Sequence, residues 1–179
     1  IGKMSDNTYG EAMNYAVGEA NEPGSVMKLA SVMALIDEGF CDENTMIDFE
    51  NGKKKYYDKV MNDAHPVSGT YSLATAFKTS SNVGISKPIF KHFSDKKELY
   101  YSKLEQFHLT KPLGIGIAGE KSPILKPYKE WTGVSLPWLA IGYEIQVTPI
   151  QILALYAAVA NNGKMMKPYL VREIKDNND

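Results

Sequence analysis

Five stretches of the chain have the hydrophobic spacing or the end signals of helices. The first begins at Ser25 and runs to about Glu38, where Gly39 is the residue type that most often follows a helix. Only two of residues 26–36 are polar, the pattern of a helix that is buried on nearly all sides. The other predicted helices cover about 72–79, 83–93, 95–107 and 148–161.

The strand predictions are fewer and shorter. Residues 45–49 alternate polar and apolar side chains and are followed by Asn51-Gly52, a strong signal for a tight turn. Residues 54–60 are therefore expected to return as the second strand of a hairpin. Another strand is predicted over 165–174.

The pattern as a whole predicts one domain, an α+β fold that is mainly helical with a few short strands. Residues 1–24 have little periodicity and are expected to be irregular. Residues 110–147 contain five Gly and four Pro and predict a long structured connection. Thr148-Pro149-Ile150-Gln151 then combines an N-cap residue, a first-turn proline and a capping-box glutamine, so a helix should begin there.

The composition is that of an ordinary globular protein. Of the 179 residues 44% are hydrophobic, and 20 Lys and Arg face 21 Asp and Glu, which argues against disorder and against a nucleic-acid partner. The longest apolar run, 152–160, is too short to cross a bilayer. Cys41 is the single cysteine and the three His lack metal-ligand spacing, so neither a disulfide nor a metal or cofactor is predicted. Because the chain opens at Ile1, we expect a piece of a longer protein.

Ser25 and Lys28 are the first candidates for chemistry. Residues three apart on a helix share a face, so the amine can reach the hydroxyl. Serine becomes a nucleophile when a base takes its proton, and burial can lower the pKa of a lysine enough for it to be that base. Lys28 lies in the apolar stretch, and the backbone N–H groups at the helix start would favour negative charge near Ser25.

A purely structural interpretation stands beside this one. Ser25 would cap the helix and Lys28 would extend its side chain to the surface. The spacing itself is weak, because Ser94 and Lys97 repeat it among charged residues where a lysine stays solvated.

Ser80-Ser81-Asn82 is the second candidate, at the end of the helix predicted over 72–79. A hydroxyl and an amide two residues apart could relay a proton and hold a substrate amide. The alternative is a cap or turn, which Ser and Asn commonly form. Ser5-Asp6-Asn7 has the same form but lies in the irregular opening segment, and we treat it as coincidental.

Taken in order, these pieces resemble the penicillin-binding protein transpeptidases, and most closely the class B septal, cell-division type. Residues 22–28, Glu-Pro-Gly-Ser-Val-Met-Lys, resemble the nucleophile motif Ser-x-x-Lys, and residues 80–84, Ser-Ser-Asn-Val-Gly, resemble the second motif, Ser-x-Asn. Residues 63–66 resemble the segment before that motif, and 142–151 with 160–163 resemble a later helix of class B members. The resemblance covers most of the chain from about Tyr9.

The resemblance implies a role for each candidate. Ser25 would be acylated, Lys28 would be its general base, and Ser80 and Asn82 would complete the proton network and hold the substrate amide. The implied reaction cross-links peptidoglycan stem peptides that end in D-Ala-D-Ala, and beta-lactams would trap Ser25. The implied location is the periplasmic face of the inner membrane, with an anchor outside this chain and cell-division membrane proteins as partners.

The third motif of the family, Lys-Thr-Gly or Lys-Ser-Gly on a strand, is absent from the sequence. Residues 78–80 lack the glycine, and residues 68–70 and 131–133 lack the lysine. We therefore expect residues 1–179 to be a partial domain, the helical lobe of the serine beta-lactamase and transpeptidase-like fold without its opening strand and C-terminal sheet strands. Such a piece should be inactive or nearly so and should self-associate through its uncovered apolar helix.

Two other functions remain open at this point. A serine beta-lactamase or a beta-lactam-sensing domain also has Ser-x-x-Lys, and fast turnover of a lactam would favour it over a long-lived adduct. A non-catalytic helical scaffold would have a solvated Lys28 with an ordinary pKa.

Overall fold

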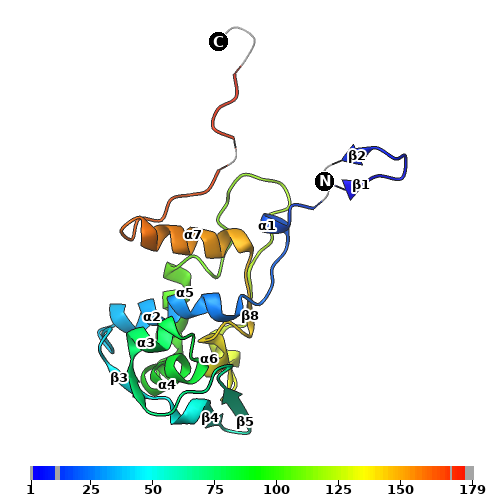
Figure 1. The fold of residues 1–179 in the computed structure, drawn as a ribbon. Coiled ribbons are helices and arrows are strands. Elements are labelled where there is room, and N and C mark those ends of the chain that lie inside the picture. The colour runs from blue at the N-terminus through cyan, green and yellow to red at the C-terminus, as the bar shows by residue number, and fades with distance from the viewer. Residues whose placement is uncertain (1, 11–12, 170, 176–179) are drawn as a thin grey trace.

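Helix α2 (Lys28–Asp37) packs against α3 (Leu73–Lys78), α4 (Asn82–Phe93) and α5 (Lys97–Gln106) in the main body of the molecule (Figure 1). The computed structural model describes residues 2–10, 13–169 and 171–175. Ala30, Ala34 and Leu35 of α2 are fully buried, but Ile36 is 48% exposed and Leu29, Val32 and Met33 are half-buried. The helix is therefore buried less completely than its apolar sequence predicts. The α-helix predicted from Ser25 begins at Lys28 instead, because the turn before it is a 3-10 helix, η1 (Gly24–Met27).

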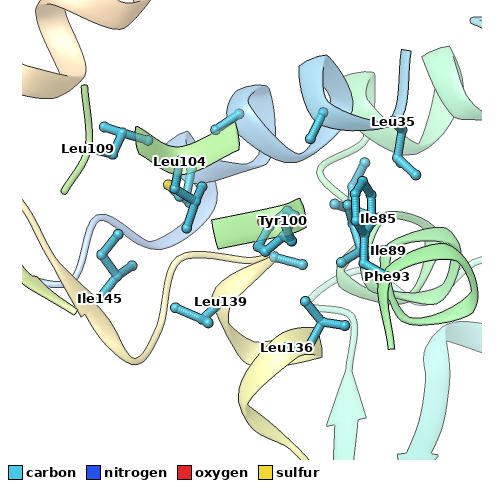
Figure 2. Close-up of a cluster of buried hydrophobic side chains, with 14 of the residues drawn as sticks. Leu35, Ile85, Ile89, Phe93, Tyr100, Leu104, Leu109, Leu136, Leu139 and Ile145 are labelled. Carbon is cyan, nitrogen blue, oxygen red and sulfur yellow. The ribbon is translucent and has the colours of Figure 1, made fainter. Parts of the chain in front are cut away.

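Four further helices confirm the predicted ones to within about two residues. The core lies where α2 meets α4 and α5, and Figure 2 shows Leu35 of α2 close to Ile85, Ile89 and Phe93 of α4. The Tyr100 hydroxyl of α5 lies 2.9 Å from the hydroxyl of Ser31 in the same core. The helices are α3 (Leu73–Lys78), α4 (Asn82–Phe93), α5 (Lys97–Gln106) and α7 (Pro149–Ala160), with two shorter ones, α1 (Tyr15–Gly18) and α6 (Ser135–Leu139).

The strands form small antiparallel pairs rather than one large sheet in the described part of the chain. The pairs are β1 (Gly2–Lys3) with β2 (Tyr9–Gly10), β3 (Met46–Asp48) with β6 (Thr70–Ser72), β4 (Lys53–Tyr56) with β5 (Lys59–Asn62), and β7 (Ile124–Leu125) with β8 (Ile145–Gln146). The β1–β2 pair projects away from the main body (Figure 1). The predicted α+β class is confirmed.

The predicted hairpin between 45–49 and 54–60 is wrong. Asn51 and Gly52 both have positive φ, 57° and 71°, but they lie in a short 3-10 turn, η2 (Glu50–Gly52), that does not fold the chain back onto β3. The chain reverses instead at Tyr57, whose φ is 52°, and β4 pairs with β5. The partner of β3 is β6, which comes directly before α3.

The strand predicted over 165–174 is also wrong. Residues 164–169 and 171–175 have no regular structure and are mostly exposed, and residue 170 lies outside the described residues. Alternating side chains form a strand only where a partner supplies the ladder of hydrogen bonds, and no described strand pairs with this segment. The opening segment, expected to be irregular, contains β1, β2 and α1. None of the described helices has both the length and the apolar composition needed to cross a membrane.

Candidate active site

Lys28, the first residue of α2, lies at the centre of a hydrogen-bonded cluster. Its side chain is buried, with a relative exposure of 1%. Its Nζ donates to the Ser80 carbonyl oxygen at 2.6 Å, to Ser80 Oγ at 3.0 Å and to Asn82 Oδ1 at 2.7 Å. These three acceptors match the three N–H donors of an ammonium group. The structure therefore brings three of the four predicted site residues together across more than fifty positions of sequence.

Ser80 has a backbone conformation that is uncommon for a serine. It follows the C-cap of α3 with a φ of 55°. Its N–H donates to the Phe77 carbonyl at 3.1 Å, and the Ser81 N–H donates to the Ala76 carbonyl at 2.9 Å. This pair of bonds is the Schellman motif, in which glycine is the usual residue at the left-handed position. Ser80 adopts this unfavourable backbone conformation, and both its carbonyl oxygen and its Oγ contact Lys28 Nζ.

Asp63 holds the start of α4, next to Asn82. The carboxylate accepts from Ser81 Oγ at 2.7 Å and from the Val83 N–H at 2.9 Å, and Ser81 Oγ in turn caps the helix by accepting from the Gly84 N–H at 2.8 Å. The carboxylate thus fixes the turn on which Ser80 and Asn82 stand. The C-terminal turn that the structural interpretation proposed is present at Ser80, and Ser81 is in addition the N-cap of α4, yet Ser80 and Asn82 also contact Lys28.

Asp63 was not among the predicted site residues, although residues 63–66 resemble the segment before the second motif. Its position could have indicated a role, because Asp63 directly follows β5. The last residue of that strand, Asn62, also contacts the site. The Asn62 carbonyl accepts from Asn82 Nδ2 at 2.7 Å. One strand end therefore orients both the helix and its amide side chain.

Ser25 is exposed and lies in η1, one turn before Lys28. No side chain caps η1, and Pro23 stands at its N-cap position, so the capping interpretation of Ser25 is wrong. The interpretation that Lys28 reaches the surface is wrong as well, because the side chain is buried. The Tyr156 hydroxyl of α7 donates to the Val26 carbonyl at 3.0 Å and ties η1 to that helix.

Burial lowers the pKa of Lys28 from 10.5 to about 8, because the charged form loses its hydration. The negative charge of Asp63 acts in the opposite direction and raises the pKa, but burial has the larger effect. An amine with a pKa near 8 is partly neutral at physiological pH. Lys28 can therefore accept a proton, which an ordinary lysine cannot do at that pH.

Lys103 shows that burial alone does not lower the pKa of a lysine in this chain. Its side chain is also nearly buried, but it forms ion pairs with Asp37 and Glu38. These hydrogen bonds raise the pKa of Lys103 above its ordinary value. The two lysines differ because neutral groups surround the amine of Lys28 and carboxylates surround that of Lys103.

We expect Asp63→Asn to move the pH at which Lys28 loses its proton downward. The change removes the charge that raises the pKa of Lys28, while an amide oxygen can still accept one of the two hydrogen bonds. The pH dependence of any reaction that needs neutral Lys28 should therefore shift below pH 8. An unchanged or raised inflection would contradict this electrostatic assignment.

The coincidental motifs stay apart from this cluster. Ser94 is the C-cap of α4, and Lys97 donates to the Trp131 carbonyl at 3.1 Å. The Ser5-Asp6-Asn7 segment lies in the loop between β1 and β2. The described residues contain no group of three or more His, Cys, Asp or Glu side chains that could hold a metal ion.

Comparisons with known proteins agree with the order of the motifs. The chain is 30% identical over 177 residues to the penicillin-binding protein PbpB of Mycobacterium tuberculosis, covering 96% of this chain and 24% of that protein. It is 29% identical over 154 residues to the peptidoglycan D,D-transpeptidase FtsI of Escherichia coli K12, covering 86% and 25%. The chain thus spans about a quarter of these curated relatives.

A solved structure shares the fold. Penicillin-binding protein 3 of Mycobacterium tuberculosis in complex with ampicillin superposes with a TM-score of 0.78 at 29% identity, over 92% of this chain and 35% of that one. The family model described as the penicillin binding protein transpeptidase domain matches residues 2–179. With a match over nearly its whole length, the chain belongs to the penicillin-binding protein transpeptidase domain family.

Proposed function

We propose that the protein is a serine-type peptidoglycan D,D-transpeptidase in which Ser25 is the acylated nucleophile. The observation that carries this proposal is the Lys28 cluster. A buried amine with a pKa near 8, hydrogen-bonded to a serine and an asparagine, stands one helical turn from an exposed serine. Its chemistry is that of a general base next to a nucleophile.

The cluster also indicates a route for the proton. Two of the three partners of Lys28 Nζ, the Ser80 carbonyl and Asn82 Oδ1, can only accept hydrogen bonds. The Ser80 hydroxyl can reverse its bond and donate to a neutral amine. We assign Ser80 as the relay that exchanges a proton with Lys28, and Asn82 as the group that orients Lys28 and presents an amide to the substrate.

The proposed reaction has two steps. Ser25 Oγ attacks the carbonyl of the penultimate D-Ala, an ester C–O bond forms, the amide C–N bond breaks, and the terminal D-Ala leaves with a proton supplied through the base. An amine of a neighbouring stem peptide then attacks the ester carbonyl, a new amide C–N bond forms, the ester C–O bond to Ser25 breaks, and the proton lost by the amine passes to Ser25 Oγ. The substrate is the D-Ala-D-Ala end of a stem peptide, and beta-lactams are its mimics.

Place and partners follow from the same proposal. One relative of the chain is a peptidoglycan D,D-transpeptidase, and peptidoglycan lies outside the cytoplasmic membrane. We propose an extracytoplasmic site of action, at the periplasmic face of the inner membrane, with division proteins of that membrane as partners.

The test is the intact mass of the full-length protein after incubation with benzylpenicillin, followed by peptide mapping. We expect one adduct per chain, on Ser25, and none on Ser94, which has the same spacing to a lysine. An adduct elsewhere, or none, would contradict the proposal, and rapid release of hydrolysed lactam would favour a beta-lactamase. Because residues 1–179 lack a Lys-Thr-Gly or Lys-Ser-Gly motif, we propose that they form a partial domain and expect this chain alone to be acylated about 10²-fold or more slowly.

A further inference from the structure

The backbone just before Ser25 is held by residues 142–147, about 120 positions later in the sequence. The Gly24 N–H donates to the Gly142 carbonyl at 3.0 Å, and the Glu144 N–H donates to Glu22 Oε1 at 2.9 Å. Asn21 and Val147 exchange two backbone hydrogen bonds, of 3.1 and 3.0 Å. We name this contact between residues 21–24 and 142–147 the brace.

Gly142 cannot be replaced in the brace without moving its neighbour. Its φ is 88°, a conformation that favours glycine. A Cβ atom at this position would overlap the Gly24 carbonyl oxygen and lie 2.6 Å from the Gly24 carbonyl carbon and nitrogen. These are backbone atoms, which cannot rotate away as the end of a side chain can. Any side chain on Gly142 therefore pushes against the residue that precedes Ser25.

Both sides of the brace are anchored to the rest of the fold, since Val26 accepts a hydrogen bond from Tyr156 and Met27 is fully buried. Gly142 lies three residues after Leu139, the last residue of α6, and its N–H donates to the Leu139 carbonyl at 3.0 Å. The Tyr143 N–H donates to the Trp138 carbonyl at 3.0 Å, and Leu139 is fully buried. A clash at Gly142 should consequently change the spacing between residues 23–25 and the segment that follows α6.

We propose that Gly142 and Glu22 are positioning residues that fix the place of Ser25 relative to Lys28. The contacts of the brace are made by residues 21–24 and 142–147, and the partners of Lys28 Nζ are Ser80 and Asn82. The two sets of contacts share no residue. The brace therefore sets where the nucleophile stands, and the cluster sets how basic the lysine is. The proposal rests on the function proposed for Ser25.

Gly142→Ala in the full-length protein tests the brace, with Gly163→Ala as its matched control. Gly163 also has a positive φ, of 81°, but open space surrounds the position of its Cβ. We expect Gly142→Ala to lower the first-order acylation constant for benzylpenicillin about 10- to 100-fold, with little change in the dissociation constant of the non-covalent complex. The inflection of the pH profile should stay near that of the wild type. Gly163→Ala should acylate within about twofold of the wild type.

Glu22 supplies a second test that does not depend on a strained backbone. Glu22→Ala removes the acceptor for the Glu144 N–H and should slow acylation about three- to tenfold, whereas Glu22→Gln keeps an oxygen acceptor and should stay within twofold of the wild type. If Gly142→Ala fails to fold, the acylation rates of Glu22→Ala and Glu22→Gln test whether the brace positions Ser25.

Wild-type acylation rates in Gly142→Ala, or in Glu22→Ala, would overturn the inference and leave the proposed function intact. A shifted pH inflection in Gly142→Ala would also overturn it, because the cluster would then be what changed. A wild-type protein that carries no adduct on Ser25 would instead remove the proposed function itself. The two failures are therefore distinguishable.

Discussion

Lys28→Met is expected to lower the rate constant of acylation by a beta-lactam about 10²- to 10⁴-fold, the contribution of a general base. Methionine keeps an unbranched side chain in a position that is 1% exposed, but it has no nitrogen to take the proton of Ser25. The rate is measured for the full-length protein from the intact mass of the adduct against time.

Lys103→Met is the matched control for this change. It removes another nearly buried lysine, whose partners are the carboxylates of Asp37 and Glu38. Its unfolding free energy should fall because these partners lose their counter-charge, whereas acylation should stay within about twofold of the wild type. Equal losses of acylation in both variants would mean that Lys28 contributes to folding alone.

The stability of the wild-type chain should depend on pH through Lys28. The folded chain releases this proton near pH 8 and the unfolded chain near pH 10.5. Between these values the unfolded state binds more protons, so the free energy of unfolding increases with pH. Relative to Lys28→Met, the wild type should gain up to about 1.4 kcal/mol per pH unit in this window. Urea denaturation at pH 8 and pH 10 measures the difference, and parallel pH dependence in the two proteins would contradict the lowered pKa.

Ser80→Gly is expected to separate activity from stability. Both Ser80→Gly and Ser80→Ala remove the hydroxyl that contacts Lys28 Nζ, so both should slow acylation about 10²-fold or more. Glycine adopts a φ of 55° without steric cost, whereas alanine does not. The Ser80→Gly variant should therefore be more stable than the Ser80→Ala variant by about 1–2 kcal/mol.

Chemical denaturation and the adduct assay together check this pair. Asn162→Gly is the control, because Asn162 also has a positive φ, of 53°, but lies at the end of α7. It should leave acylation within about twofold of the wild type. Equal stability of the two Ser80 variants would contradict the backbone argument, and wild-type acylation in either would contradict the relay.

Local signals in the sequence predicted the helices well because their causes are local. Gly39 follows α2, and Gln151 Oε1 accepts from the Thr148 N–H at 3.0 Å as a capping box requires. The apolar neighbours of Lys28 along α2 favoured its burial, although a surface position for its amine was an open alternative until the structure showed it buried. These features depend on residues within one or two turns.

Pairing over longer distances could not be read in the same way. Asn51 and Gly52 do lie in a turn, as their sequence predicts. The strand that pairs with β3, however, is formed by residues 70–72, about twenty positions later. Residues 165–174 have a strand-like pattern and lack a described partner strand. Asp63 was missed as a support for α4 because its two hydrogen bonds cross 18 and 20 residues. A pattern along the chain records side-chain preferences and not the identity of distant partners.

The separation of Lys28 from its partners has a consequence for synthesis of the protein. Lys28 precedes Ser80 by 52 residues and Asn82 by 54, and closing a loop of that size costs entropy that later contacts must offset. A nascent chain leaving the ribosome exposes Ser25 and Lys28 long before the other two residues emerge. Until α4 packs against α2, the Lys28 amine is an ordinary hydrated cation, so its lowered pKa arises only when folding is complete.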